Sequence, residues 1–157
     1  MSLQDIHNFV ALDDRLLTGG MPTADQLREI AHAGVQTVIN LAIPDSPRAL
    51  PDEASIVRSL GMQYLGIPVE WEHPARRDLD AFMDAMDVHT ADKVFVHCQA
   101  NYRVSGFMML YRVLRLGWDR QEAYNDLRRI WDPAEYPVWQ KLIDDSLSAS
   151  QAGGEGA

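Results

Sequence analysis

The residues best suited to chemistry in this 157-residue chain lie in one stretch, KVFVHCQANYRVSGF, from Lys93 to Phe107. It holds the only cysteine, Cys98, and an arginine, Arg103, five positions later. A thiolate can act as a nucleophile, and a guanidinium can bind two oxygens of a phosphoryl group at once. The spacing therefore indicates a nucleophile beside an anion clamp. The alternative for Cys98 is a buried structural thiol without chemistry.

The surroundings of Cys98 favour the reactive interpretation. Val94-Phe-Val-His97 is predicted as a strand buried on both faces, six residues turn, and an apolar helix is expected from about Val104 to Leu116. Loop amides and a helix N-terminus point at whatever occupies such a turn, so they suit an anion and stabilise a thiolate. Asn101, at mid-loop, tolerates the left-handed backbone that a loop folding its amides inward needs.

Hydrophobic patterns elsewhere predict the elements that position this loop. Two further strands are expected over residues 37–41 and 62–68, and helices begin near Thr23, Pro51, Asp78, Asp119 and Glu135. Strands alternating with helices predict a single α/β domain, with a central, mostly parallel sheet of four to five strands flanked by helices. Ligands in such sheets bind beyond the carboxyl ends of the strands, and Cys98 stands at that kind of position.

Composition limits the class of partner. A hydrophobic share of 46% and a charged share of 24% are ordinary for a soluble globular domain. The net charge of −9 argues against nucleic acid or an anionic membrane as a partner, because both are bound mainly through Lys and Arg. A lone cysteine, and a start without a leader pattern, predict a reducing cytoplasm. We expect a folded domain over residues 1–147 and a disordered tail over 148–157, whose apolar content is low.

Three longer segments carry a family resemblance together with the loop. They are LLTGGMPTADQLREIAHAGVQTVINLAIPD, GMQYLGIPVEWEHP and YRVLRLGWDRQEAYNDLRRI. With these segments the chain resembles the cysteine-dependent protein tyrosine and dual-specificity phosphatase superfamily over about residues 9 to 145, most closely small bacterial phosphatase-like domains. The resemblance implies the phosphatase fold and hydrolysis of phosphate monoesters, without a metal or other cofactor, on a phosphorylated protein or small molecule.

The loop departs from the family pattern in its length. The family has five residues between Cys and Arg, followed by Ser or Thr, whereas four residues separate Cys98 from Arg103 here. One register deletes a loop residue and keeps Arg103 as the clamp, with Val104 at the hydroxyl position. The other places Val104 where the arginine belongs and keeps Ser105 as the hydroxyl residue. The spacing from Arg103 to Tyr111 favours the deletion.

Residue roles follow from the resemblance. Cys98 would attack phosphorus, Arg103 would hold phosphoryl oxygens, and His97 would orient the loop from behind. Substrate binding is expected from the rest of the loop and the start of the helix: Gln99, Ala100, Asn101, Tyr102, Val104 and Ser105. The general acid is expected on the loop after the 62–68 strand, with Glu72 preferred over Glu70 and Asp78. Aromatic residues such as Trp131, Tyr136 and Trp139 are predicted to pack in the core, and Trp71 either lines the pocket or packs.

Two other functions fit the short loop. Its length matches that of the loop in rhodanese-like sulfurtransferases. If this chain works as they do, Cys98 would carry a persulfide. A non-catalytic phosphate-binding or interaction domain is the second alternative. The sequence leaves substrate identity and oligomeric state open.

Overall fold

The computed structural model describes residues 2–155 and shows one mixed sheet at the centre of the chain. Its five strands run in the order β1-β2-β5-β3-β4. Their bounds are Val10–Ala11 for β1, Leu16–Gly19 for β2, Thr37–Asn40 for β3, Gln63–Gly66 for β4 and Val94–His97 for β5. β1 pairs antiparallel with β2, and the other neighbours are parallel. The predicted mostly parallel α/β sheet is confirmed.

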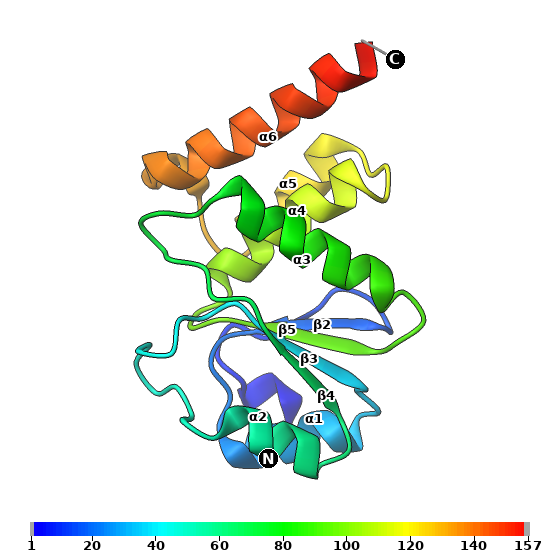
Figure 1. Cartoon of the computed structure of the whole chain (residues 1–157), viewed down its shortest axis with the longest axis vertical. Helices are drawn as coiled ribbons and strands as arrows, with labels where there is room; N and C mark the ends of the chain where they lie inside the picture. Colours follow the sequence, from blue (N-terminus) through cyan, green and yellow to red (C-terminus); the bar gives the residue numbers. More distant parts are fainter. Residues whose placement is uncertain (1, 156–157) are drawn as a thin grey trace.

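Helices cover both faces of this sheet (Figure 1). One layer holds α1 (Ala24–His32), α2 (Glu53–Ser59) and the short 3₁₀ helix η1 (Leu3–Asp5). The opposite layer holds α3 (Arg76–Val88), α4 (Tyr102–Leu114), α5 (Arg120–Arg128), η2 (Pro133–Glu135) and α6 (Pro137–Glu155). β5 lies at the middle of the sheet, so the segment that follows it emerges at the centre of the molecule.

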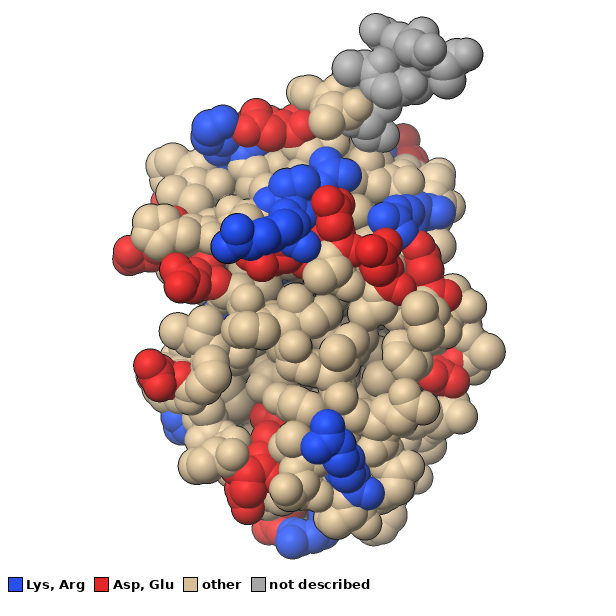
Figure 2. All heavy atoms as spheres, in the orientation of Figure 1, with Lys and Arg blue, Asp and Glu red and all other residues tan. Residues whose placement is uncertain are grey.

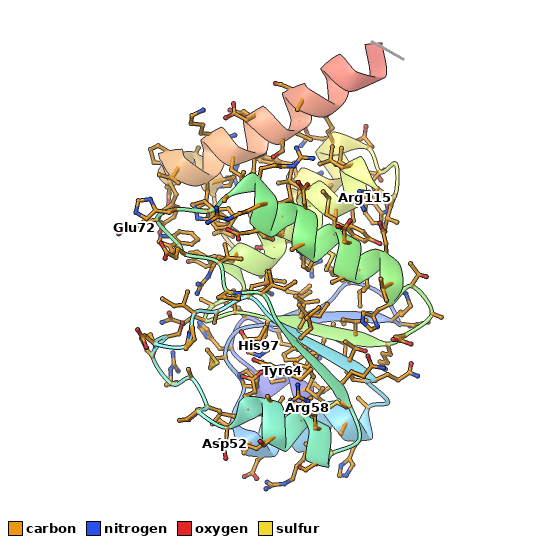
Figure 3. All side chains as sticks on the ribbon, in the orientation of Figure 1. Asp52, Arg58, Tyr64, Glu72, His97 and Arg115 are labelled. Atoms are coloured by element: carbon orange, nitrogen blue, oxygen red, sulfur yellow. The ribbon has the colours of Figure 1, made fainter. Side chains whose placement is uncertain are left out.

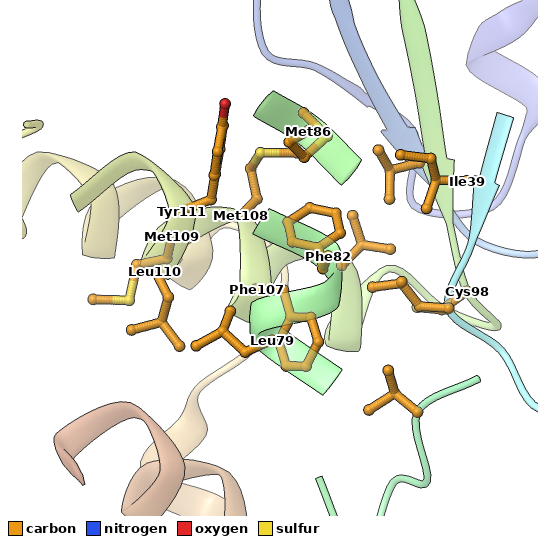
Figure 4. Packing of buried hydrophobic residues seen from close by; sticks show 14 of the residues in the cluster. Ile39, Leu79, Phe82, Met86, Cys98, Phe107, Met108, Met109, Leu110 and Tyr111 are labelled. Carbon is orange, nitrogen blue, oxygen red and sulfur yellow. The ribbon is translucent and has the colours of Figure 1, made fainter. Parts of the chain in front are cut away.

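The alternation of side chains along β5 distributes the core between the two layers. Val94 and Val96 belong to the cluster under α3 and α4, whereas Phe95 belongs to the cluster under α1 and α2. Successive strand residues point to opposite faces, so Cys98 continues the first set and His97 the second. Cys98 accordingly borders the cluster that contains Phe82 (Figure 4). The strand pattern therefore decides which layer each of these two residues meets.

Local signals explain several helix boundaries. Thr23 and Gln26 form a capping box at the start of α1: the Gln26 amide donates to Thr23 Oγ1 at 3.1 Å and the Thr23 amide donates to Gln26 Oε1 at 2.9 Å. Asp119 caps α5 by accepting from the Glu122 amide at 3.1 Å. The helix expected to begin near Asp78 starts slightly earlier, because α3 begins at Arg76, and Asp78 accepts from the Ala75 amide at 3.1 Å.

Other boundaries differ by a few residues from the expectation. α4 begins at Tyr102, two residues before the expected start, and the strand expected over 62–68 is limited to β4. α6 extends to Glu155 and so enters the 148–157 stretch, of which residues 156–157 lie outside the described part of the chain. Within residues 2–155, we find no helix with the length and apolarity to cross a membrane.

Candidate active site

The segment after β5 forms the floor of an open pocket of about 300 Å³. Cys98, Gln99, Ala100, Tyr102 and Arg103 line it, and Trp71 and Tyr136 complete its wall. The Cys98 side chain is only 1% exposed, and its backbone amide donates to the Gly19 carbonyl of β2 at 3.3 Å. This bond fixes the start of the loop to the carboxyl end of the sheet. The thiol thus lies at the bottom of the pocket, enclosed on its inner side by core residues.

Arg103 shares this pocket with Cys98 although it belongs to the first turn of α4. It is 6% exposed, and its Nη1 donates to the Val69 carbonyl at 2.8 Å. That carbonyl lies on the connection between β4 and α3, so the guanidinium is held from across the pocket. Val104 is fully buried in the hydrophobic cluster. The geometry therefore brings Arg103, and not Val104, beside Cys98.

Several backbone donors of the loop are available to an anion. Within residues 2–155, the amides of Gln99, Ala100, Tyr102 and Arg103 have no backbone acceptor. Asn101 has φ = 68°, the left-handed conformation expected at mid-loop. Tyr102 and Arg103 also form the N-terminus of α4, where unpaired N–H groups favour negative charge. Loop amides, helix terminus and guanidinium thus lie together next to the thiol, an arrangement that suits an anion.

Aromatic side chains form the side of the pocket that faces away from the sheet. The ring centroid of Trp71 lies 5.8 Å from that of Tyr102 and 5.0 Å from that of Tyr136. Trp139 Nε1 donates to the Trp71 carbonyl at 2.8 Å. The Trp139 ring also stacks on the Trp71 ring, with 5.2 Å between the two centroids. Trp131 and Trp139 are buried, as expected. Tyr136 was expected only to pack, but it also lines the pocket, and no sequence motif marks it.

Comparison with known proteins identifies the family. A family described as DSP-PTPase phosphatase fused to NAD+ kinase matches residues 4–133. The chain belongs to this DSP-PTPase family. The match covers the whole sheet and the helices up to α5, so the resemblance drawn from the loop and its flanking segments is confirmed.

Individual relatives agree with the assignment of this DSP-PTPase domain. A candidate phosphatase (DUF442) from Shewanella putrefaciens CN-32 is 38% identical, with a TM-score of 0.83 over 94% of this chain and 93% of that chain. TpbA of P. aeruginosa, solved in complex with pTyr, is 16% identical and shares the fold, with a TM-score of 0.70 over 92% of this chain and 90% of that chain.

A curated relative is considerably longer. The beta-lactamase hydrolase-like protein of Xylella fastidiosa is 30% identical over 106 residues, which are 65% of this chain and 23% of that protein. The chain thus spans about a quarter of the length of the curated relatives that it matches.

His97 of the DSP-PTPase domain lies behind the loop, on the α2 side of the sheet. Its Nδ1 is 3.2 Å from the Cys98 carbonyl oxygen, and its Nε2 is 2.7 Å from Glu53 Oε2. Both His97 and Glu53 are buried. The side-chain Nδ2 of Asn40 donates to Glu53 Oε1 at 3.4 Å and to the Tyr64 hydroxyl at 3.2 Å. Glu53 was not anticipated from the sequence, because nothing in its local pattern shows that α2 brings it beneath β5.

Three residues expected to bind substrate lie outside the lining of the pocket. The Asn101 side chain turns to the rear of the loop, Val104 enters the core, and Ser105 Oγ donates to the Asn101 carbonyl at 2.6 Å. Ser105 also accepts from Trp131 Nε1 at 2.8 Å. For Val104 and Ser105 the physical reason is the early start of α4, which makes both of them helix positions. Gln99, Ala100 and Tyr102 do line the pocket, and they remain our predicted substrate-binding residues.

None of the three candidate acids lines the Cys98 pocket. Glu72 lines a neighbouring pocket that shares Trp71 and Tyr136 with it, on the outer side of the connection between β4 and α3 (Figure 3). Glu70 is exposed, and Asp78 is engaged with the Ala75 amide. Of the three, Glu72 alone lies in a pocket adjoining the Cys98 pocket.

The charged side chains on the domain surface are mixed in sign, so we look to the loop for the groups that would attract an anion. On the face in Figure 2, basic and acidic side chains are interspersed, most of them over the α3–α6 layer. Exposed or partly exposed arginines of this layer are paired with carboxylates, for example Arg115 with Asp84 at 3.2 Å and Arg76 with Asp80 at 2.9 Å. Among residues 2–155, we find no cluster of three or more His, Cys, Asp or Glu side chains placed to hold a metal ion.

Proposed function

We propose that this domain hydrolyses phosphate monoesters through Cys98. The observation that carries the proposal is the pocket in which the thiol, the Arg103 guanidinium and the unpaired loop amides meet. Membership of the DSP-PTPase family supports it independently. The loop donors suit the charge that spreads over phosphoryl oxygens during transfer.

The reaction would proceed in two displacements. The Cys98 thiolate attacks phosphorus, the bond to the ester oxygen breaks, and the leaving oxygen takes a proton from the general acid, for which we propose Glu72. Water then attacks the thiophosphate, which releases inorganic phosphate and returns the thiolate. Arg103 holds two phosphoryl oxygens throughout, since its fork matches their geometry. The loop connecting β4 and α3 has to carry Glu72 toward the pocket for this role.

The substrate is proposed at the level of a phosphorylated protein or small molecule. Tyr102, Trp71 and Tyr136 give the pocket an apolar wall against which an organic group can pack. TpbA, which shares the fold, has been solved with pTyr, and phosphotyrosine is a suitable first substrate to assay. We expect the reaction to take place in a reducing cytoplasm, because it needs Cys98 as a free thiol.

An assay with two substrates separates this function from its rivals. Purified protein is given an aryl phosphate and, separately, thiosulfate with cyanide, each in parallel with Cys98→Ser. Phosphate release that Cys98→Ser abolishes supports the proposal. Thiocyanate release dependent on Cys98 would instead show sulfur transfer, in which thiosulfate gives its outer sulfur to the thiolate, leaves as sulfite, and cyanide removes that sulfur. Phosphate binding without either turnover would show a non-catalytic binding domain.

A further inference from the structure

The rear of the phosphate loop is tied to the beginning of the chain. Asn101 is fully buried, and its side-chain Nδ2 donates to the Asn8 carbonyl at 2.8 Å and to Thr18 Oγ1 at 3.1 Å. Both acceptors lie on the side of the loop opposite to the pocket. Because Nδ2 has two acceptors, the Asn101 side-chain amide is oriented with its nitrogen toward Asn8 and Thr18.

The same segment also reaches back to the loop. Asn8 Nδ2 donates to the Ala100 carbonyl at 2.9 Å, so Asn8 and the loop exchange two hydrogen bonds. Thr18 Oγ1 in turn donates to the Val10 carbonyl at 2.9 Å. Gly20 lies so close to the loop that a Cβ there would stand 2.6 Å from the Gln99 carbonyl oxygen. The loop is therefore held along its rear by direct contacts and not by a general apolar surface.

Backbone geometry makes these contacts consequential for the anion site. Asn8 and Asn101 both have left-handed backbones, with φ of 51° and 68°. Asparagine adopts this conformation more readily than most residues, but it still costs energy that local hydrogen bonds must offset. A change at Asn101 would rotate the peptide units that carry the Tyr102 and Arg103 amides. The direction of the anion donors thus depends on the rear contacts of Asn101.

We propose that Asn8, Thr18 and Asn101 are positioning residues that hold the short phosphate loop with its amides toward the bound anion. The proposal rests on the proposed function for its catalytic meaning, but the anion site it describes can be measured without turnover. None of the three residues touches the pocket, so each acts through the loop backbone.

A pair of buried threonines gives a matched test. Thr18→Val removes the acceptor of Asn101 and keeps the side-chain shape. Thr37→Val removes a comparable hydroxyl that lies 3.3 Å from Asp92 Oδ2, at the opposite end of the sheet. Both threonines are almost completely buried, so both variants should lower the melting temperature. Only Thr18→Val should weaken binding of inorganic phosphate, by about tenfold, which corresponds to the loss of one buried hydrogen bond.

A second variant separates backbone strain from the lost contact. Asn8→Gly tolerates the left-handed backbone and removes the bond to the Ala100 carbonyl, together with a long 3.5 Å contact to His7 Nε2. It should weaken phosphate binding by about threefold, with a larger change in KM than in kcat for an aryl phosphate. Measurements are made by calorimetry well below the melting temperature, with phosphate as the ligand.

The phosphate affinities of the three variants decide whether the positioning role holds. Weaker phosphate binding in Thr18→Val and Asn8→Gly, with Thr37→Val unchanged, supports the positioning role, even if no phosphatase turnover is found and the proposed function fails. Folded Thr18→Val and Asn8→Gly proteins that bind phosphate as tightly as the unsubstituted protein would overturn the role, even if turnover is present. Equal weakening in Thr37→Val would also overturn it, because the effect would then be a general loss of stability.

Discussion

At the residue scale, Arg103 illustrates how side-chain geometry resolves a register that the sequence leaves open. It is anchored by the Val69 carbonyl and lies in the same pocket as Cys98, while Val104 is core. The length of the loop alone could not decide this, because both alignments place a plausible residue nearby. What decides is that α4 begins at Tyr102, which turns the next side chain toward the pocket.

We predict that Arg103→Ala lowers kcat/KM for an aryl phosphate by about 10²- to 10³-fold, because the variant loses a charged donor to the transferring group. Arg103→Lys should restore only a small part, since an ammonium cannot hold two oxygens as a fork. Steady-state kinetics and phosphate inhibition measure both effects. Kinetics unchanged in Arg103→Ala would mean that another residue holds the anion.

A separate prediction concerns Glu72. If it protonates the leaving oxygen, Glu72→Gln should lower kcat for phenyl phosphate by about 10²-fold and leave p-nitrophenyl phosphate much less affected, because nitrophenolate departs without a proton. Glu70→Gln, on the same connection but outside the lining of the pocket that holds Glu72, is the control. An equal loss on both substrates would remove Glu72 from the acid role.

At the element scale, the two layers of helices meet the site through the last residue of β5, His97, and the residue that follows the strand, Cys98. Cys98 borders the α3–α4 cluster, while His97 contacts Glu53 of α2. That β5 is a strand buried on both faces could be predicted from its sequence, and so could most of the helices, because these depend on local apolar patterns and caps. The partnership of His97 with Glu53, and that of Asn101 with Asn8, could not, because each joins residues distant in the chain.

The buried pair gives a stability prediction. Glu53→Leu leaves His97 Nε2 without its acceptor, and we expect a loss of about 2 kcal/mol in the free energy of unfolding. Urea denaturation followed by tryptophan fluorescence measures it. Glu122→Leu, at an exposed position of α5, should change the same quantity by less than about 0.5 kcal/mol. Similar losses in the two variants would show that the contact with His97 contributes little.

At the scale of the whole molecule, we expect the free energy of unfolding to fall at alkaline pH, where tyrosines titrate. Burial is the main cause that raises the pKa of Tyr64 and also that of Tyr111. The folded protein therefore holds these protons more tightly than the unfolded chain, in which tyrosine titrates near pH 10. The stability they contribute is fully present below about pH 10 and is lost as the pH rises through the folded-state values.

We accordingly expect the free energy of unfolding to fall as the pH rises past about 10, the ordinary tyrosine pKa, and Tyr64→Phe to make this fall shallower. Denaturant titrations at pH 8, 9.5 and 10.5, chosen to span the ordinary tyrosine pKa of about 10, test it. An equally steep fall in Tyr64→Phe would assign the alkaline loss to other groups. Arginine stays protonated throughout this range, so the arginines do not contribute to the fall.

The rear contact between Asn101 and Asn8 joins residues 93 positions apart. Such a contact forms only after a long loop has closed, so it is expected late on the folding pathway, once β2 and β5 have paired. The anion site would then be absent from the transition state for folding. Phosphate should consequently slow the unfolding rate in proportion to its occupancy and leave the refolding rate unchanged, which stopped-flow measurements at several phosphate concentrations can determine. An anion bound to this loop would therefore slow the unfolding of the folded domain without speeding the assembly of the sheet.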